Sequence, residues 1–423
     1  MMDAASSGLD REKHRHAVLD NKSTATPRVR PMTEPTERAA ADGVRQRNLA
    51  RMLRLVHLDG PLSRASLTEA TGLNRSTIAD LAGELVRGGL VEERAPDPSR
   101  RVGRPSPVVG AASGVVAIGV NPELDAVTMA AVGLDRTISL RTRIEVDHLI
   151  TPPETAAMVA AQLATWRRGG LGEARIAGVG LAVPGLVRAA DGLVRNAPHL
   201  RWTDSPLRDL VAEATGVPTS VGNDAMLGAV AEHLFGAARG VDDVVYLNGG
   251  ASGIGGGLIV GGVPVPGAGG YAGEFGQNRP GIAATSDRRA GDGVLEDEVS
   301  RARLLAAVKL HSADEPSLAA ALATSESVTV AEEVARQRRI LATALGNAVN
   351  VLNPSVVVLG GFLATLAEQD LDGLVDAVAR QAMPASMEGL SIRTAVLAED
   401  RLLIGAAELA FSDLLRDPAA FAP

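Results

Sequence analysis

Cysteine is absent from all 423 residues, so disulfide bonds, thiolate zinc sites and cysteine nucleophiles are excluded together. Aromatic residues make up only 2% of the chain, and its cores must therefore be built from aliphatic side chains. No apolar run approaches the ~18 residues that a membrane-spanning helix needs, and the N-terminus has no signal-peptide apolar segment. These absences predict a cytoplasmic protein that does not bind membranes.

Charge is distributed unevenly along the chain. The net charge of −8 argues against nucleic acid covering the whole surface. Residues 45–104 nevertheless carry 11 Arg against 7 Asp or Glu, a local charge of +4 that leaves −12 for the remainder. One segment therefore suits the phosphates of a nucleic acid, and the rest of the chain suits a different ligand.

Residues 1–43 are polar and lack hydrophobic periodicity, which predicts a disordered arm, within which Met32 offers an alternative start. Residues 44–104 then show the pattern of a helix-turn-helix. A first amphipathic helix is followed by a short helix capped by Ser63 and ended by Gly72, and by a third helix capped by Asn74. A short strand and an arginine-bearing loop come next, in the manner of a wing.

Small polar and basic groups on the first turn of such a third helix can reach base edges in the major groove of DNA. The extended tripeptide Gly103-Arg104-Pro105 suits a minor groove or a phosphate. The alternative is a helical bundle whose arginines only face solvent. The candidate DNA contacts are Ser63, Arg64, Asn74, Arg75, Ser76, Thr77, Asp80, Arg94, Arg101 and Arg104.

After a predicted linker at residues 105–112, strands alternate with helices over residues 113–423, which predicts two α/β lobes with a cleft between them. The glycine-dense run Leu247–Gly262 would let the backbone approach a ligand closely, although a tight hairpin turn explains such a run equally well. Asn223 and Asp224 lie upstream at the join between a strand and a helix. There they suit a ligand contact, a helix N-cap or both.

Six segments, in this order, resemble the ROK family of repressors and sugar kinases. The resemblance covers nearly everything after about residue 110, and it implies the actin-like, two-lobed sugar-kinase fold. The preceding segment resembles the all-α winged helix-turn-helix domain of the family's repressors. The segments are Gly178–Val187 (GVGLAVPGLV), Ala197–Trp202 (APHLRW), Val221–Ala225 (VGNDA), Ser252–Gly257 (SGIGGG), Ala272–Gly276 (AGEFG) and Val358–Gly361 (VLGG).

The resemblance also implies a sugar site. Sugar hydroxyls both donate and accept hydrogen bonds, so paired carboxylates and amides suit them. Asp224 matches the general base of the family's kinases. The predicted sugar-binding residues are Asn223, Asp224, Glu274, Gln277 and Glu296.

The family's phosphate hairpin is altered in this sequence. Asn121 stands where the kinases have aspartate, and Pro122 and Glu123 follow in place of glycines. Phosphoryl transfer needs a cradle for ATP and its metal, which these residues do not offer. We therefore expect no kinase activity, no catalytic residue and no cofactor.

The family's zinc positions are altered as well. A histidine and three cysteines are replaced by Gln277, Asp287, Arg289 and Val294, which cannot form a tetrahedral zinc site. We therefore expect no metal, and the loop at residues 278–292 must be held in another way.

The leading hypothesis is a DNA-binding transcriptional regulator, a repressor of carbohydrate-utilisation genes. Its predicted partners are double-stranded operator DNA, a sugar or sugar-phosphate effector, and further copies of itself in a homodimer or homotetramer. One alternative is a ROK sugar kinase with an accessory DNA-binding domain. Another is a ligand-independent regulator whose sugar site is vestigial.

Overall fold

The computed structural model describes residues 37–95, 106–282, 284–290 and 293–421. The chain divides into residues 1–43 and 44–423. Most of the predicted N-terminal arm lies outside the described residues, but α1 (Glu37–Asp59) begins earlier than the helix start expected at Val44. Among the described helices, none combines the length and apolar character needed to cross a bilayer.

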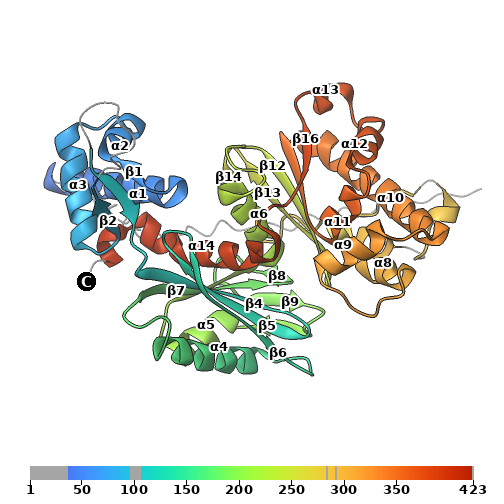
Figure 1. Ribbon diagram of the computed structural model, residues 1–423, viewed down its shortest axis with the longest axis horizontal. Helices are drawn as coiled ribbons and strands as arrows, with labels where there is room; N and C mark the ends of the chain where they lie inside the picture. The colour runs from blue at the N-terminus through green and yellow to red at the C-terminus, as the bar shows by residue number, and fades with distance from the viewer. Residues whose placement is uncertain (1–36, 96–105, 283, 291–292, 422–423) are drawn as a thin grey trace, which may run out of the picture. The chain divides into compact units, whose positions relative to one another are not determined.

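Residues 44–111 form a winged helix-turn-helix, called the head below (Figure 1). Local capping explains its short helices: the Ser63 side chain accepts from Ser66 N at 3.0 Å, and Asn74 Oδ1 accepts from Thr77 N at 2.8 Å. The expected caps are therefore confirmed. The elements after α1 are β1 (Leu62–Ser63), α2 (Arg64–Thr71), α3 (Arg75–Arg87), β2 (Val91–Arg94) and β3 (Val108–Ala111).

The linker predicted for residues 105–112 needs correction. Residues 108–111 are β3, the central strand of a sheet with the order β1-β3-β2. Leu62 pairs with Val109, and Val91 pairs with Ala111, both antiparallel. The head therefore closes only after the wing, because its central strand comes last in the sequence.

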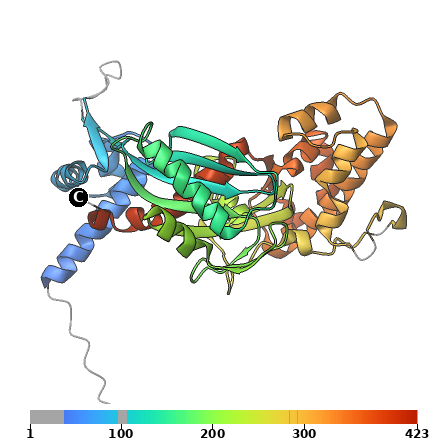
Figure 2. The ribbon, with the colours of Figure 1, turned by 90° about the horizontal axis from the view of Figure 1, so that it is seen from below.

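The first lobe of the body is built on a five-stranded sheet with the order β11-β7-β4-β5-β6. Helices α4 and α5 lie on one side of it, and α14 lies on the other (Figures 1 and 2). A small sheet, β10-β9-β8, which the sequence did not predict, follows β7. The elements are β4 (Val115–Pro122), β5 (Ala126–Gly133), β6 (Ile138–Glu145), α4 (Pro152–Arg167), β7 (Arg175–Val183), β8 (Leu186–Val187), β9 (Val194–Ala197), β10 (Trp202–Ser205), α5 (Leu207–Thr215) and β11 (Thr219–Asn223).

The second lobe is built on the sheet β14-β13-β12-β15-β16. Its buried strands are rich in valine and leucine, as the low aromatic content required. The expected single helix at residues 363–381 is two helices, because Asp370 caps a new one through Gly373 N. The main elements are α6 (Asp224–Phe235), β12 (Val244–Gly250), β13 (Gly253–Val260), β14 (Val263–Pro264), α7 (Leu295–Glu298), α8 (Arg301–Ala307), α9 (Glu315–Ala323), α10 (Val328–Leu352), β15 (Val356–Gly361), α11 (Phe362–Glu368), α12 (Leu371–Ala379), α13 (Pro384–Met387), β16 (Ser391–Thr394) and α14 (Arg401–Arg416).

Glycine allows α14 to pack directly on the first sheet. A Cβ added at Gly180 of β7 would lie 1.8 Å from the Ala406 carbonyl oxygen, and one at Gly119 of β4 would lie 2.2 Å from that of Leu403. Backbone therefore touches backbone along the helix. The glycines of the GVGLAVPG segment have a structural role here.

Helix α14 also joins the body to the head. Its residues Phe411, Leu414 and Leu415 belong to the same hydrophobic core as α1 and α3 of the head. Within that core, His57 Nε2 lies 3.1 Å from the Glu408 carboxylate, and His57 Nδ1 lies 2.6 Å from the Leu134 carbonyl oxygen. Burial lowers the pKa of His57, but these two acceptors outweigh it and leave that pKa raised.

Candidate functional site

Asn223 and Asp224 stand at the junction of β11 and α6. Asn223 Oδ1 accepts from Met226 N at 2.9 Å as the N-cap of α6, and its Nδ2 donates to the Gly185 carbonyl at 3.0 Å. Asp224 accepts from Ala225 N at 2.8 Å. Asn223 therefore serves as a helix cap, and the two residues hold each other through a 3.2 Å hydrogen bond.

Glu296 lies on α7, and two glycines from other segments make room for its carboxylate. It accepts from Ile254 N of β13 at 3.1 Å and from Gln277 Nε2 at 2.6 Å. A Cβ added at Gly253 or at Gly276 would lie 2.4 Å or 2.6 Å from its Oε2. The glycine-rich hairpin is therefore more than a tight turn, because it admits a carboxylate that comes from 42 residues further along the chain.

Glu274 brings a further carboxylate into the same neighbourhood. It precedes the short 3-10 helix Phe275–Gln277, and no hydrogen bond to its carboxylate is found among the described residues. Burial raises the pKa of Glu274, and the negative charge of Glu296 raises it further. The charges of Glu274 and Glu296 thus interact, and within the described residues the Glu274 carboxylate has no hydrogen-bond partner.

Asp224 has the most perturbed carboxyl group of the cluster. Burial raises the pKa of Asp224 to about 7, to which the charge of Glu274 contributes, while the Ala225 amide and Arg401 act in the opposite direction. Such a group can accept or donate a hydrogen bond near neutral pH. The five predicted sugar-binding residues are therefore joined by hydrogen bonds or by electrostatic coupling.

Arg401, which the sequence analysis missed, lies beside this cluster. It is 5% exposed, and it donates from Nε to Asn248 Oδ1 at 3.2 Å and from Nη2 to Glu315 at 3.1 Å. Its charge also stabilises the ionised form of Asp224. No sequence signal marks it, because its partners are 153 and 86 residues away.

The altered hairpin between β4 and β5 does not fit the phosphates of a nucleotide. Asn121 is buried and donates to the Ala182 carbonyl at 3.0 Å. Glu123 and Asp125 form ion pairs with Arg143, each at 2.8 Å. Arg143 balances only one of these two negative charges, and Pro122 has no N–H group to donate, so the hairpin disfavours phosphate.

The residues at the family's zinc positions do not fit a metal either. The Asp287 carboxylate is paired with Arg339 at 2.8 Å, and the Gln277 amide is used by Glu296. Arg289 adds a positive charge, and the Val294 side chain has no atom that can ligate a metal. Within the described residues, no group of three or more His, Cys, Asp or Glu is placed to hold a metal ion.

The candidate DNA contacts differ in their surroundings. Arg75, Ser76 and Asp80 are exposed on α3, whereas Thr77 is half-buried. Arg64 pairs with Glu93 and Arg94 pairs with Glu92. Ser63 and Asn74 are occupied as helix caps. Arg101 and Arg104 lie outside the described residues.

Comparisons with known proteins agree with this arrangement. A model of the ROK family matches residues 118–412. A xylose repressor of Caldicellulosiruptor bescii is 24% identical over 402 residues, which cover 84% of this chain and 93% of the repressor. A glucokinase of Halalkalibacterium halodurans is 28% identical over 254 residues, 54% of this chain and 74% of the kinase.

A solved structure matches most of the chain. It is that of a ROK family transcriptional regulator, a homologue of the E. coli Mlc protein, with a TM-score of 0.70 at 22% identity over 88% of this chain and 97% of that one. The likeness supports the two-lobed fold with a winged helix before it. Because the family model runs from β4 to α14 and so includes both lobes and the carboxylate cluster, the chain belongs to the ROK family.

Proposed function

We propose that this protein is a transcriptional repressor that binds operator DNA through its head and a sugar or sugar phosphate through its body. The observation that carries the proposal is the combination of a winged helix-turn-helix and the coupled carboxylates of a ROK body in one chain. The relative named a xylose repressor matches over 93% of its own length and over 84% of this chain. Carbohydrate-utilisation genes are the corresponding targets.

The exposed start of α3 supports DNA binding. Arg75 and Ser76 stand on its first turn, where a recognition helix contacts base edges and phosphates. Arg64 and Arg94 can exchange their carboxylate partners for phosphates, because exposed ion pairs contribute only about 0–1 kcal/mol. In the proposal, Ser63, Asn74, Thr77, Asp80, Arg101 and Arg104 complete the interface.

The state of the carboxylates supports a sugar as the ligand of the body. Glu274 carries a raised pKa and no hydrogen bond among the described residues, so hydroxyl groups can supply what it lacks. Asp224, with a pKa of about 7, can accept from one hydroxyl or donate to another. Asn223, Gln277 and Glu296 complete the proposed site.

Helix α14 supports a route from the sugar to the DNA. Its first residue, Arg401, lies beside the carboxylates, and Glu408 contacts His57 of the head. A helix resists bending, so a displacement at one end moves the other. In a homodimer or homotetramer, the two recognition helices must match half-sites about 10 base pairs apart, and a small change in their spacing lowers affinity.

A fluorescence-anisotropy titration tests the proposal. Full-length protein is titrated into labelled DNA from upstream of its own gene, first alone and then with a panel of pentoses, hexoses and their phosphates. We expect nanomolar binding that one sugar weakens at least tenfold. Absence of DNA binding in every ligand state contradicts the proposal. DNA binding that no sugar changes supports the alternative of a ligand-independent regulator.

A sugar kinase with an accessory head is the second candidate. The glucokinase relative and the raised pKa of Asp224, which matches the kinases' general base, favour it. The β4–β5 hairpin opposes it, because Pro122 and Glu123 replace the glycines expected of a kinase, and Glu123 and Asp125 are paired with Arg143. ADP release in a coupled assay with ATP and the same sugar panel decides between the two functions, and we expect none.

A further inference from the structure

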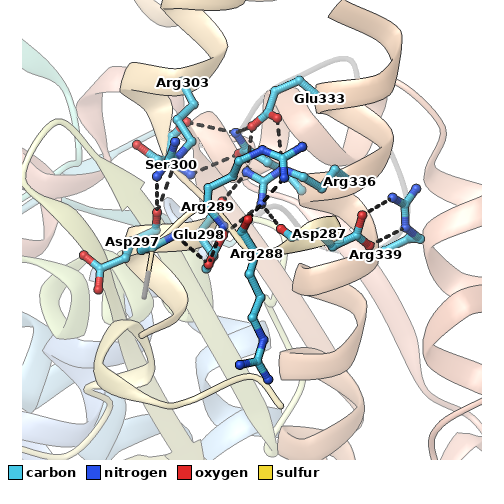
Figure 3. A network of polar contacts seen from close by, with 12 residues as sticks. Asp287, Arg288, Arg289, Asp297, Glu298, Ser300, Arg303, Glu333, Arg336 and Arg339 are labelled. Atoms are coloured by element: carbon cyan, nitrogen blue, oxygen red, sulfur yellow. Dashed lines mark hydrogen bonds and ion pairs between the residues drawn. The ribbon is translucent and has the colours of Figure 1, made fainter. Parts of the chain in front are cut away.

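A buried ion-pair cluster stands beside the loop that the family's zinc would hold. Arg336 of α10 is 2% exposed and Glu298 of α7 is 1% exposed. Arg336 Nη1 donates to Glu298 Oε2 at 2.9 Å, and Nη2 donates to the Glu298 carbonyl at 2.8 Å. Figure 3 shows these two side chains at the centre of a polar network between α10 and the loop.

All five N–H groups of the Arg336 guanidinium have an acceptor. Beyond the two bonds to Glu298, Nη1 donates to the Asp287 carbonyl at 2.8 Å, while Nε and Nη2 donate to Glu333 at 2.9 Å and 2.7 Å. Gln337 Nε2 donates to the same Glu333 carboxylate at 2.8 Å. A buried ion pair is stabilising only when its remaining donors and acceptors are satisfied, which is the case here.

The Glu298 carboxylate also holds the loop backbone. It accepts from Arg289 N at 2.9 Å and from Ala290 N at 3.0 Å. On the outer side, Asp287 pairs with Arg339 at 2.8 Å. Arg336 and Arg339 of α10 therefore hold residues 287–290 through ion pairs with Glu298 and Asp287, in the region where the family has a zinc site.

The same cluster fixes the short helix that carries Glu296. Glu296 and Glu298 both belong to α7, which has only four residues. One end of α7 is held by Arg336, and Leu295 N donates to the Asn278 carbonyl at 2.8 Å at the other. The orientation of the Glu296 carboxylate toward Ile254 N thus depends on the Glu298–Arg336 contact.

We propose that Arg336, Glu298 and Glu333 form a metal-free clamp that positions Glu296 and the 287–290 loop for sugar binding. The clamp supplies a buried cation, as a metal would, and Glu298 links that cation to two loop amides. Arg336 is thus a positioning residue that does not touch the ligand. The sugar-binding part of this inference rests on the proposed function, whereas the metal-free holding of the loop does not.

Limited trypsin digestion of the full-length protein tests the clamp without any ligand. Trypsin cuts after arginine, and the bonds after Arg288 and Arg289 contain the two amides that Glu298 holds. We expect the same slow cleavage at these bonds, measured by mass spectrometry, in EDTA and in added Zn²⁺. Arg336→Gln should accelerate it at least tenfold in both media.

Matched variants separate the clamp from general stability. Arg338→Gln removes another ion pair of α10, with Asp370 at 2.6 Å, but does not touch the loop. It should leave cleavage after Arg288 and Arg289 unchanged even if it lowers the melting temperature. If Arg336→Gln does not fold, Glu298→Gln is measured in its place. Arg336→Lys should be cleaved after Arg288 and Arg289 at a rate between those of the wild type and Arg336→Gln.

Calorimetric sugar titration provides the second readout. Arg336→Gln should raise the Kd of the effector about tenfold, while operator affinity without sugar stays unchanged. Chelator-accelerated cleavage of the wild type, or equal cleavage of wild type and Arg336→Gln, overturns the clamp. Unchanged sugar affinity despite faster cleavage overturns the positioning of Glu296. A wild type that binds no sugar contradicts the proposed function alone, because the digestion still decides how the loop is held.

Discussion

Two carboxylates of the proposed sugar site, Asp224 and Glu274, lie in surroundings that disfavour their ionised forms. Asp224 has a pKa raised to about 7 by burial, and Glu274 has a raised pKa through burial and the charge of Glu296. A folded protein that keeps such groups without a ligand loses stability at high pH. Binding sites commonly retain groups of this kind because a ligand satisfies them.

Asp224→Asn should change how stability depends on pH. A group whose folded pKa is raised above its unfolded value of 3.8 stabilises the fold fully below that value, and this contribution is lost as pH rises through about 7. The free energy of unfolding of the wild type should therefore fall by on the order of a few kcal/mol between pH 4 and 8. That of the variant should not show this fall. Denaturant unfolding across this range measures the difference.

The control for this prediction is Asp372→Asn. Asp372 lies on the first turn of α12, just as Asp224 lies on the first turn of α6, but Asp372 is exposed. It should retain the pH dependence of the wild type and its sugar affinity, whereas Asp224→Asn should lose sugar binding. A parallel pH profile for Asp224→Asn and wild type would contradict the raised pKa.

At the scale of elements, short helices and strands owe their positions to a few local contacts. The start of α3 is set by its Asn74 cap, which leaves Arg75 and Ser76 exposed. The docking of α14 is set by glycines in β4 and β7. Each contact makes a prediction about one element.

Arg75→Ala should weaken operator binding. Loss of a base contact costs about 1–3 kcal/mol, and loss of a phosphate contact lowers the salt dependence of binding by about one charge. Arg87→Ala, at the last turn of the same helix, is the control and should have little effect. Anisotropy titrations at several salt concentrations distinguish the two kinds of contact, and equal effects of both variants would refute the orientation of α3.

Gly180→Ala should loosen α14 from the first sheet. The added methyl group would meet the Ala406 carbonyl oxygen at 1.8 Å, so the helix must move, at a cost of about 1–3 kcal/mol. Gly114→Ala is the control, because its added Cβ would have no neighbour within 4 Å. Thermal unfolding measures both, and equal melting temperatures would show that α14 is not in contact there.

At the scale of residues 44–423, the head and the body share one hydrophobic core. His57 and Glu408 form a polar contact within it, with 1% and 8% exposure. Burial opposes the charge on His57, but Glu408 and Leu134 raise its pKa overall. The stabilisation from protonated His57 is fully present below its ordinary pKa of 6.5 and is lost as pH rises through the raised pKa of the folded protein.

Glu408→Ala should uncouple the two parts of the molecule. Without its partner, buried His57 becomes unfavourable by about 1–3 kcal/mol, and the head should melt before the body in differential scanning calorimetry. The sugar response of operator binding should shrink as well. Glu399→Ala removes an exposed partner of Arg141 and is the control. A single unchanged transition in Glu408→Ala would contradict a coupling role for this contact.

The sequence by itself determined the features that depend on neighbours in the chain. Caps such as Ser63 and Asn74 act over three residues, so the helix-turn-helix could be predicted from spacing. Alternating helices and strands predicted the α/β body, and resemblance to the ROK family indicated the carboxylates of the proposed sugar site. The absence of cysteine excluded a thiolate zinc site in advance.

Only the tertiary structure decided the contacts between distant residues. Arg336 pairs with Glu298, 38 residues away in the sequence, and His57 contacts Glu408, 351 residues away. Strand β3 was expected to be a linker because its pairing with Leu62 lies far outside any local pattern. Helix propensity and capping act over a few residues, whereas ion pairs and strand register are selected by packing, so these parts of the molecule could not be inferred from spacing alone.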